Sequence, residues 1–170
     1  MLKKVLITSA ILFFASTVNA DGGYIGVSIG QTDIDLSGFD DGGSVAFTGG
    51  YRVNKNFAVE ASYVDLGESE DDIFPVWTIE VDGFNFSAVG IIPVNDKVDF
   101  FGKVGMFMWD VTLDEAGTGE LASDDGTDIS IGFGVAANLT DQFGVVFEYH
   151  KFDLDGEDVT NMSIGARLSF

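Results

Sequence analysis

Large apolar residues alternate with small or polar residues along most of the chain after residue 20. In the clearest stretch, residues 128–139, positions such as Ile131 are apolar and positions such as Gly132 are small. Alternation with a period of two indicates a β-strand that has one apolar face, and no stretch of similar length has the period of an amphipathic helix. The pattern predicts eight strands, at residues 24–33, 44–53, 57–66, 76–92, 98–113, 128–139, 143–154 and 161–170.

The two faces of the predicted strands differ in the size of their side chains. One face is uniformly large and apolar, whereas the other mixes glycine and small polar residues with a few charges. A soluble sandwich buries its large face. A narrow membrane barrel instead turns its apolar face to lipid and keeps a polar interior. Eight strands can close such a barrel, and closure leaves no unpaired strand edge in lipid. We therefore predict an all-β fold, an eight-stranded antiparallel up-and-down transmembrane β-barrel, with a soluble periplasmic β-barrel as the alternative.

The N-terminal segment has the features of a secretory signal peptide. Two lysines precede an apolar run at residues 5–14, which is shorter than the roughly 20 residues of a spanning helix. A small-residue pattern that ends at Ala20 suits signal peptidase. We therefore expect residues 1–20 to be cleaved off after Ala20 and residues 21–170 to form the barrel in the cell outer membrane.

The connections between predicted strands alternate between two lengths, as in outer-membrane barrels with short periplasmic turns and longer outer loops. Most acidic residues lie in or beside the longer segments, so the predicted outer end is strongly acidic. The short turns are expected at residues 54–56, 95–97 and 140–142, and the longer loops at 34–43, 67–75, 114–127 and 154–160.

Composition limits the classes of protein that remain. The chain has 170 residues and a net charge of −20, from 28 acidic and 8 basic side chains. That acidity argues against nucleic acid as a partner, because a phosphate backbone needs a basic surface. The absence of cysteine excludes disulfides and thiolate metal sites. A hydrophobic fraction of 46% excludes an acidic disordered chain.

An ordered set of segments resembles the transmembrane domain of the outer membrane protein A family. The set comprises residues 24–30, 49–54, 59–63 with 66–67, Pro93, 102–105, 147–149 and 163–170. The resemblance implies a barrel inserted by the outer-membrane assembly machinery, with the terminal Phe170 as the assembly signal.

The chain departs from that family at two points. The sequence does not continue into the C-terminal peptidoglycan-binding domain of the larger members, so tethering to the cell wall is not expected. Glu60 matches one acidic position of the family's interior gate, but the other three positions fall at Val89, Ala136 and Val146. A gated pore of the family type is therefore not implied.

Five charged residues fall on the small, inward face of the predicted strands. An unpaired charge in a barrel interior would be costly, so we expect these side chains to pair with one another. The alternative is that they line an ion path. The five are Arg52, Glu60, Lys103, Glu148 and Arg167.

His150 is the only histidine, and a catalytic role for it would need a nucleophile and an orienting acid nearby. Some eight-stranded outer-membrane barrels are lipid A deacylases that have a serine two residues after the histidine. This chain has Phe152 at that position, so we expect no enzyme and interpret His150 as an interior polar group beside Glu148.

Acidic residues in the predicted outer loops could supply oxygen ligands to a divalent cation. None of the clusters has the twelve-residue spacing of an EF-hand, so we expect a solvated acidic surface, with no dedicated metal site and no cofactor. The candidate ligands are Asp40, Asp41, Asp124, Asp125, Asp128, Asp153, Asp155, Glu157 and Asp158.

Four aromatic residues near predicted strand ends suit a girdle at the lipid interface. They are Trp77, Trp109, Tyr63 and Tyr149.

These observations together predict a monomeric integral outer-membrane protein with a structural or surface-interaction role. Its expected partners are outer-membrane lipid, lipopolysaccharide, and surface ligands or divalent cations at the acidic outer end. The alternatives are a narrow channel for ions or small solutes and, less favoured, a lipid-modifying enzyme.

Overall fold

The computed structural model describes residues 22–34, 42–70, 77–115 and 119–170. The expected signal peptide at residues 1–20 lies outside the described residues, as do Asp40 and Asp41.

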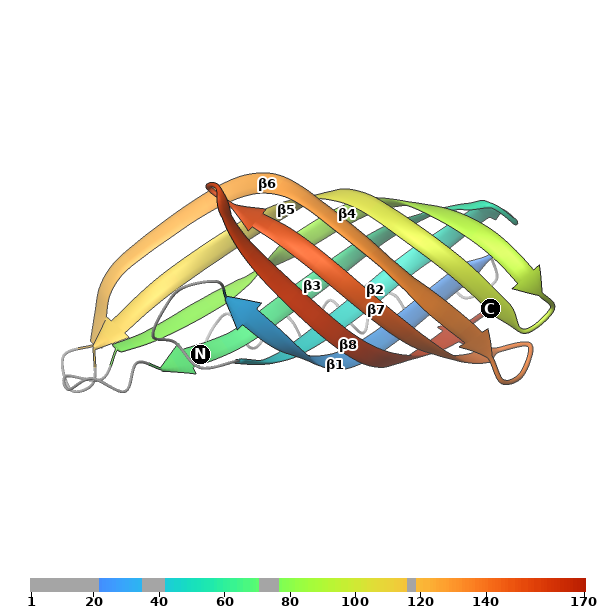
Figure 1. The fold of residues 1–170 in the computed structure, drawn as a ribbon, viewed down its shortest axis with the longest axis horizontal. Helices are drawn as coiled ribbons and strands as arrows, with labels where there is room; N and C mark the ends of the chain where they lie inside the picture. Colours follow the sequence, from blue (N-terminus) through green and yellow to red (C-terminus); the bar gives the residue numbers. More distant parts are fainter. Residues whose placement is uncertain (1–21, 35–41, 71–76, 116–118) are drawn as a thin grey trace.

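Eight antiparallel strands form a closed barrel in which each strand pairs with its neighbour in sequence and β8 pairs with β1. Figure 1 shows the strands crossing the barrel obliquely, with the C-terminus at the end that carries the short turns. The predicted fold class is therefore confirmed. The strands are β1 (Gly23–Ile34), β2 (Gly42–Asn54), β3 (Phe57–Glu70), β4 (Trp77–Asn95), β5 (Val98–Glu115), β6 (Gly119–Asn138), β7 (Phe143–Leu154) and β8 (Glu157–Ser169).

The alternation in the sequence corresponds to the two faces of the barrel wall. On β6, Ile129 and Phe133 point outward and are 61% and 60% exposed, whereas Ser130 between them is fully buried inside. The same arrangement covers the whole circumference, so the outer surface carries a continuous band of apolar side chains. Such a band would be unfavourable in water and matches the hydrocarbon core of a bilayer.

Short turns join the strands at one end, where the sequence predicted them. In the β2–β3 turn the Asn54 side chain accepts a hydrogen bond from the Asn56 amide (2.8 Å). In the β4–β5 turn Asn95 accepts one from the Lys97 amide (2.8 Å), and in the β6–β7 turn Thr140 accepts one from the Phe143 amide (2.9 Å). Asn and Thr stabilise these turns because their side chains mimic a backbone acceptor.

Two of the predicted long loops are wrong. Most of 114–127 belongs to the β5–β6 hairpin at the outer end (Figure 1), in which Val111 pairs with Asp124. Strand β4 pairs with β5 as far as Glu115. Beyond the bilayer a strand has no lipid-facing side, so its sequence need not alternate and the prediction missed it. The loop at 154–160 is a tight β7–β8 turn in which Asp155 (φ 53°) and Gly156 (φ 93°) are both left-handed. Asp-Gly is a preferred pair for such a hairpin turn.

The barrel interior is filled by two apolar layers. The outer layer consists of Val64, Leu66, Val81, Phe107, Trp109, Phe152, Leu154 and Val159. The layer nearer the short turns consists of Tyr24, Ala58, Val89, Ile91, Phe101 and Ala136.

The prediction that Trp109 belongs to an aromatic girdle at the lipid interface is wrong. Its side chain is only 6% exposed and belongs to the outer interior layer, because it shares the inward face of β5 with Phe107. Tyr63 and Tyr149 do point outward, where they pack on Phe84 and Phe133 respectively. The side chain of Trp77 lies outside the described part. Among the residues that the structure describes, no helix has the length and hydropathy of a membrane span.

Candidate functional site

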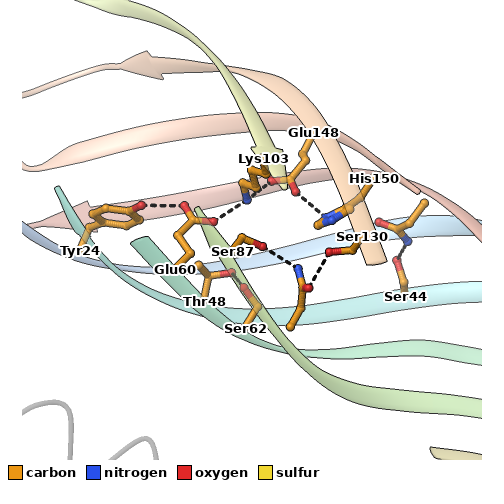
Figure 2. Close-up of polar contacts among 12 residues, drawn as sticks. Tyr24, Ser44, Thr48, Glu60, Ser62, Ser87, Lys103, Ser130, Glu148 and His150 are labelled. Atoms are coloured by element: carbon orange, nitrogen blue, oxygen red, sulfur yellow. Dashed lines mark hydrogen bonds and ion pairs between the residues drawn. The ribbon is translucent and has the colours of Figure 1, made fainter. Parts of the chain in front are cut away.

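A chain of buried polar side chains crosses the barrel interior, as Figure 2 shows. The Tyr24 hydroxyl donates a hydrogen bond to Glu60 Oε1 (2.7 Å). Lys103 Nζ lies 2.6 Å from Glu60 Oε2 and 2.6 Å from Glu148 Oε2, so one ammonium group bridges two carboxylates. These residues come from β1, β3, β5 and β7, so the chain ties alternate strands together across the interior.

His150 ends this chain on the side of the outer layer. Its Nδ1 lies 2.9 Å from Glu148 Oε1, and its ring stacks on Phe152 with 4.3 Å between ring centroids. Gly132 faces the ring across the β6–β7 pairing, and a Cβ there would lie 3.2 Å from His150 Cγ. The glycine therefore leaves room for the histidine, which lies beside Glu148 as the sequence analysis expected.

Close ion pairs offset the free-energy cost of burying these charged side chains. The side chains of Lys103 and Glu60 are 7% and 9% exposed. Removing either ion from water costs several kcal/mol, which close ion pairs and hydrogen bonds must offset. Each strand contributes a residue from an inward position of its alternation, so the same pattern that exposes apolar groups to lipid directs these charges inward.

The two interior arginines have partners outside the predicted set of five. Arg52 Nη2 lies 2.7 Å from Asp99 Oδ2, and Arg167 Nη2 donates to Asn138 Oδ1 (3.0 Å). The Arg167 guanidinium also lies over the Tyr24 ring, 5.4 Å from its centroid. The structure thus joins Glu60, Lys103 and Glu148 directly but does not pair either arginine with them. Asp99 was missed, although it lies on the inward face of β5 four residues before Lys103.

Uncharged groups complete the polar middle of the barrel. Asn85 accepts a hydrogen bond from Ser130 (2.7 Å) and donates one to Ser87 (3.0 Å). The Thr48 and Ser62 hydroxyls are 2.9 Å apart, and Asn161 donates to Thr32 and Ser44. Paired groups of this kind stabilise a unique arrangement of strands because each would be costly to bury alone.

A small space lies beside the charged groups of the interior. A cavity of about 60 Å³ is lined by Arg52, Glu60, Asp99, Lys103 and Arg167 among others. That volume holds a few water molecules. In the described part of the barrel, the outer apolar layer separates this cavity from the outer end. Such packing suits a plugged barrel better than a continuous wet path.

The outer end carries a row of four aspartates that the sequence analysis did not detect. Strand pairing sets Asp65 on β3 opposite Asp82 on β4, Asp82 opposite Asp110 on β5, and Asp110 opposite Asp125 on β6. The row lies directly beyond the outward row that contains Tyr63, and the Tyr63 hydroxyl donates to Asp82 Oδ2 (2.9 Å). We name these four residues the aspartate row. Only the register brings them together, because 60 residues separate its ends.

Several of the candidate cation ligands have structural partners instead. Asp128 accepts hydrogen bonds from the Trp109 indole (2.8 Å) and from the Asp155 amide (3.2 Å), so it joins β5 to the β7–β8 turn. Asp153 accepts one from the Gly156 amide (2.9 Å). Asp158 lies 2.6 Å from Lys151 Nζ.

The remaining described candidates are not grouped into a metal site. Asp124 and Asp125 are exposed on β6, and Glu157 begins β8. Across the described ranges, no three histidine, aspartate or glutamate side chains are grouped so that they could hold a metal ion.

The sequence and the fold were compared with known proteins. A family model described as "Outer membrane protein beta-barrel domain" matches residues 5–170. The chain belongs to this family. The apolar outer band is therefore the membrane-facing surface of an eight-stranded outer-membrane transmembrane barrel, and the resemblance inferred from the sequence is confirmed at the level of the barrel.

Several solved structures have a similar fold. The attachment invasion locus protein Ail of Yersinia pestis is 17% identical, with a TM-score of 0.63 over 89% of this chain and 100% of Ail. Neisserial surface protein A is 18% identical, with a TM-score of 0.68 over 88% and 98%. OprG of Pseudomonas aeruginosa is 11% identical, with a TM-score of 0.63 over 88% and 97%. These identities support the fold alone, and no curated protein sequence matches the chain.

Proposed function

We propose that this barrel is a monomeric structural protein of the outer membrane whose acidic outer end is a surface for interaction. The observation that supports the proposal most directly is the aspartate row just beyond the lipid-facing band. Like charges directly opposite one another on neighbouring strands destabilise a sheet. An interaction with cations at the membrane border would offset that repulsion.

The partner that best suits this position is lipopolysaccharide, bound through divalent cations. The aspartate row lies where the outer leaflet meets water, and lipopolysaccharide phosphates would repel it unless cations lie between them. Ail has been solved with the heparin analogue sucrose octasulfate. We do not extend that ligand to this chain, because an identity of 18% supports the fold alone.

Cation-dependent retention of lipopolysaccharide tests the proposal. The variant Asp110→Asn/Asp125→Asn removes two charges from the row, and Asp96→Asn/Asp141→Asn removes two from exposed positions in the short turns. Purified barrels are expected to retain lipopolysaccharide in calcium and to lose most of it in chelator. The first variant should retain several-fold less than the second. Equal retention by both variants, or no effect of chelator, would contradict the proposal.

The channel and the enzyme are the competing functions. We infer no steady conductance, because the outer apolar layer fills the interior between the buried charges and the outer end. We infer no catalysis, because His150 Nε2 has no hydrogen-bond partner within the described residues and Phe152 follows where a serine would be needed. Reproducible current steps in planar bilayers would support the channel. Altered lipid A that depends on His150 would support the enzyme.

We also propose that the protein reaches the outer membrane through cleavage after Ala20 and through recognition of Phe170 by the assembly machinery. N-terminal sequencing of the membrane-embedded protein should begin at Asp21. Deletion of Phe170 should slow the appearance of the heat-modifiable folded form, and assembly at the normal rate would contradict a role for this residue.

A further inference from the structure

The lipid-facing wall carries a groove that the proposed function does not use. It has a volume of about 610 Å³ and is open to the outside of β1–β4, which lie side by side in Figure 1. Much of the remaining outward face carries large side chains such as Met106 and Phe133. The groove is a depression in this apolar surface where small side chains of four neighbouring strands meet.

Strand register explains how the groove forms. One outward row contains Gly23, Tyr51, Val59 and Ala88, and the next contains Ile25, Gly49, Ala61 and Phe86. In each strand one of the two positions is small and the other is large. The small positions are adjacent from strand to strand and form the floor, while the large ones form the walls. Phe170 closes one end, because its ring lies against Gly23.

The dimensions and position of the groove suit one leaflet of a bilayer. The three spacings between four neighbouring strands, at about 4.8 Å each, give a length of about 14 Å, close to half the roughly 30 Å hydrocarbon core. Tyr51 and Phe170 lie near the short-turn end of the barrel. The groove therefore begins at the periplasmic border and runs obliquely toward the middle of the membrane.

A positive charge lies beyond the periplasmic end of the groove. Lys55 is exposed at the tip of the β2–β3 turn, four residues after Tyr51, and it makes no ion pair within the part of the chain that the structure describes. Its two neighbours in the turn are the uncharged Asn54 and Asn56. An apolar groove that ends near an unpaired cation is complementary to an acyl chain joined to a phosphate.

We propose that this groove binds one glycerophospholipid of the periplasmic leaflet, with an acyl chain across Gly49, Ala61 and Ala88 and the phosphate near Lys55. The walls formed by Tyr51 and Phe86 contact the acyl chain on both sides. This contact distinguishes the bound lipid from the mobile lipid around the rest of the barrel. A second copy of the protein would need a protruding apolar element to fill the groove, and the periplasmic cation would then have no partner.

Native mass spectrometry of the purified whole barrel, with phosphatidylglycerol or lipopolysaccharide added to the detergent, tests the proposal. The variant Ala61→Leu/Ala88→Leu fills the floor, and Ala137→Leu/Ala166→Leu adds the same volume to outward positions of β6 and β8. Heat modifiability on gels checks that each variant is folded. The wild type should carry one phosphatidylglycerol, and filling the floor should weaken the affinity at least about fivefold, equivalent to about 1 kcal/mol.

The control variants and the second lipid distinguish a phospholipid site from the alternatives. The control variant should bind as the wild type does, and Lys55→Gln should lower occupancy about twofold. Unchanged binding in the filled variant, or equal loss in the control, would overturn a specific site. Preferential binding of lipopolysaccharide in the groove, or loss of a dimer in the filled variant, would overturn the identity of the occupant.

Discussion

The middle of the barrel and its outer end are both rich in charged side chains, but opposite charges are paired in the middle and like charges are adjacent at the outer end. In the middle, Lys103 contacts both Glu60 and Glu148 inside the barrel wall. At the outer end, the aspartate row places like charges opposite one another across three strand pairs. Burial makes an unpaired charge costly, whereas water and salt screen the exposed row. The buried charges must therefore be paired for the barrel to fold. The exposed carboxylates at the outer end tolerate repulsion and remain available to bind partners.

Removing the buried ammonium group of Lys103 should have the largest effect on stability. Lys103→Met should leave two buried carboxylates without a counter-charge and lower the free energy of unfolding by about 3–5 kcal/mol. Urea titration of the barrel in lipid vesicles measures the change. Lys151→Met, which breaks the exposed pair with Asp158, is the matched control and should change stability little. If both variants lower the free energy of unfolding by the same amount, burial does not determine how much an ion pair contributes to stability.

The hydrogen bond between Trp109 and Asp128 tests the outer border of the interior. Trp109→Phe removes the indole donor, leaves the apolar contacts mostly in place, and should cost about 1–2 kcal/mol in the same titration. Tyr63→Phe removes an outward-facing hydrogen bond to Asp82 and should cost less, because water can replace it. A larger loss for Tyr63→Phe would reverse the expected order.

The β7–β8 turn tests whether backbone geometry matters at the outer end. Gly156 has a φ of 93°, so Gly156→Ala should destabilise the barrel by about 1 kcal/mol, although a Cβ there would meet no neighbouring atom. Gly43→Ala is the control, since it also has open space and its φ is not positive. Equal effects in the two variants would show that the turn conformation carries no strain for alanine.

The smallest expected effect has the opposite sign. Asp110→Asn/Asp125→Asn relieves repulsion within the aspartate row and should raise stability by a few tenths of a kcal/mol at low salt. The gain should shrink as salt is added, because screening already weakens the repulsion. Titrations at two ionic strengths measure it, and a loss of stability at low salt would show that these carboxylates hold the strands together.

Sequence reasoning succeeded where a local period carries the information and failed where it does not. The apolar band could be predicted because residues such as Ile131 and Phe133 face lipid, which forces alternation along each strand. The β5–β6 extension was missed because residues such as Asp124 pair beyond the bilayer, where nothing requires alternation. Trp109 was misplaced because an aromatic residue near a strand end suits both an interfacial girdle and an interior plug. Its position on the face that also carries Phe107 was the available signal.

The sequence by itself determined that eight strands close into a membrane barrel and which side of each strand faces lipid. Both follow from a period of two, which depends only on neighbouring residues. The tertiary structure decided that Arg52 pairs with Asp99, that one lysine bridges two glutamates, and that four aspartates form a row. These contacts join residues on different strands. They depend on the register and stagger of the whole closed sheet, which no single strand encodes.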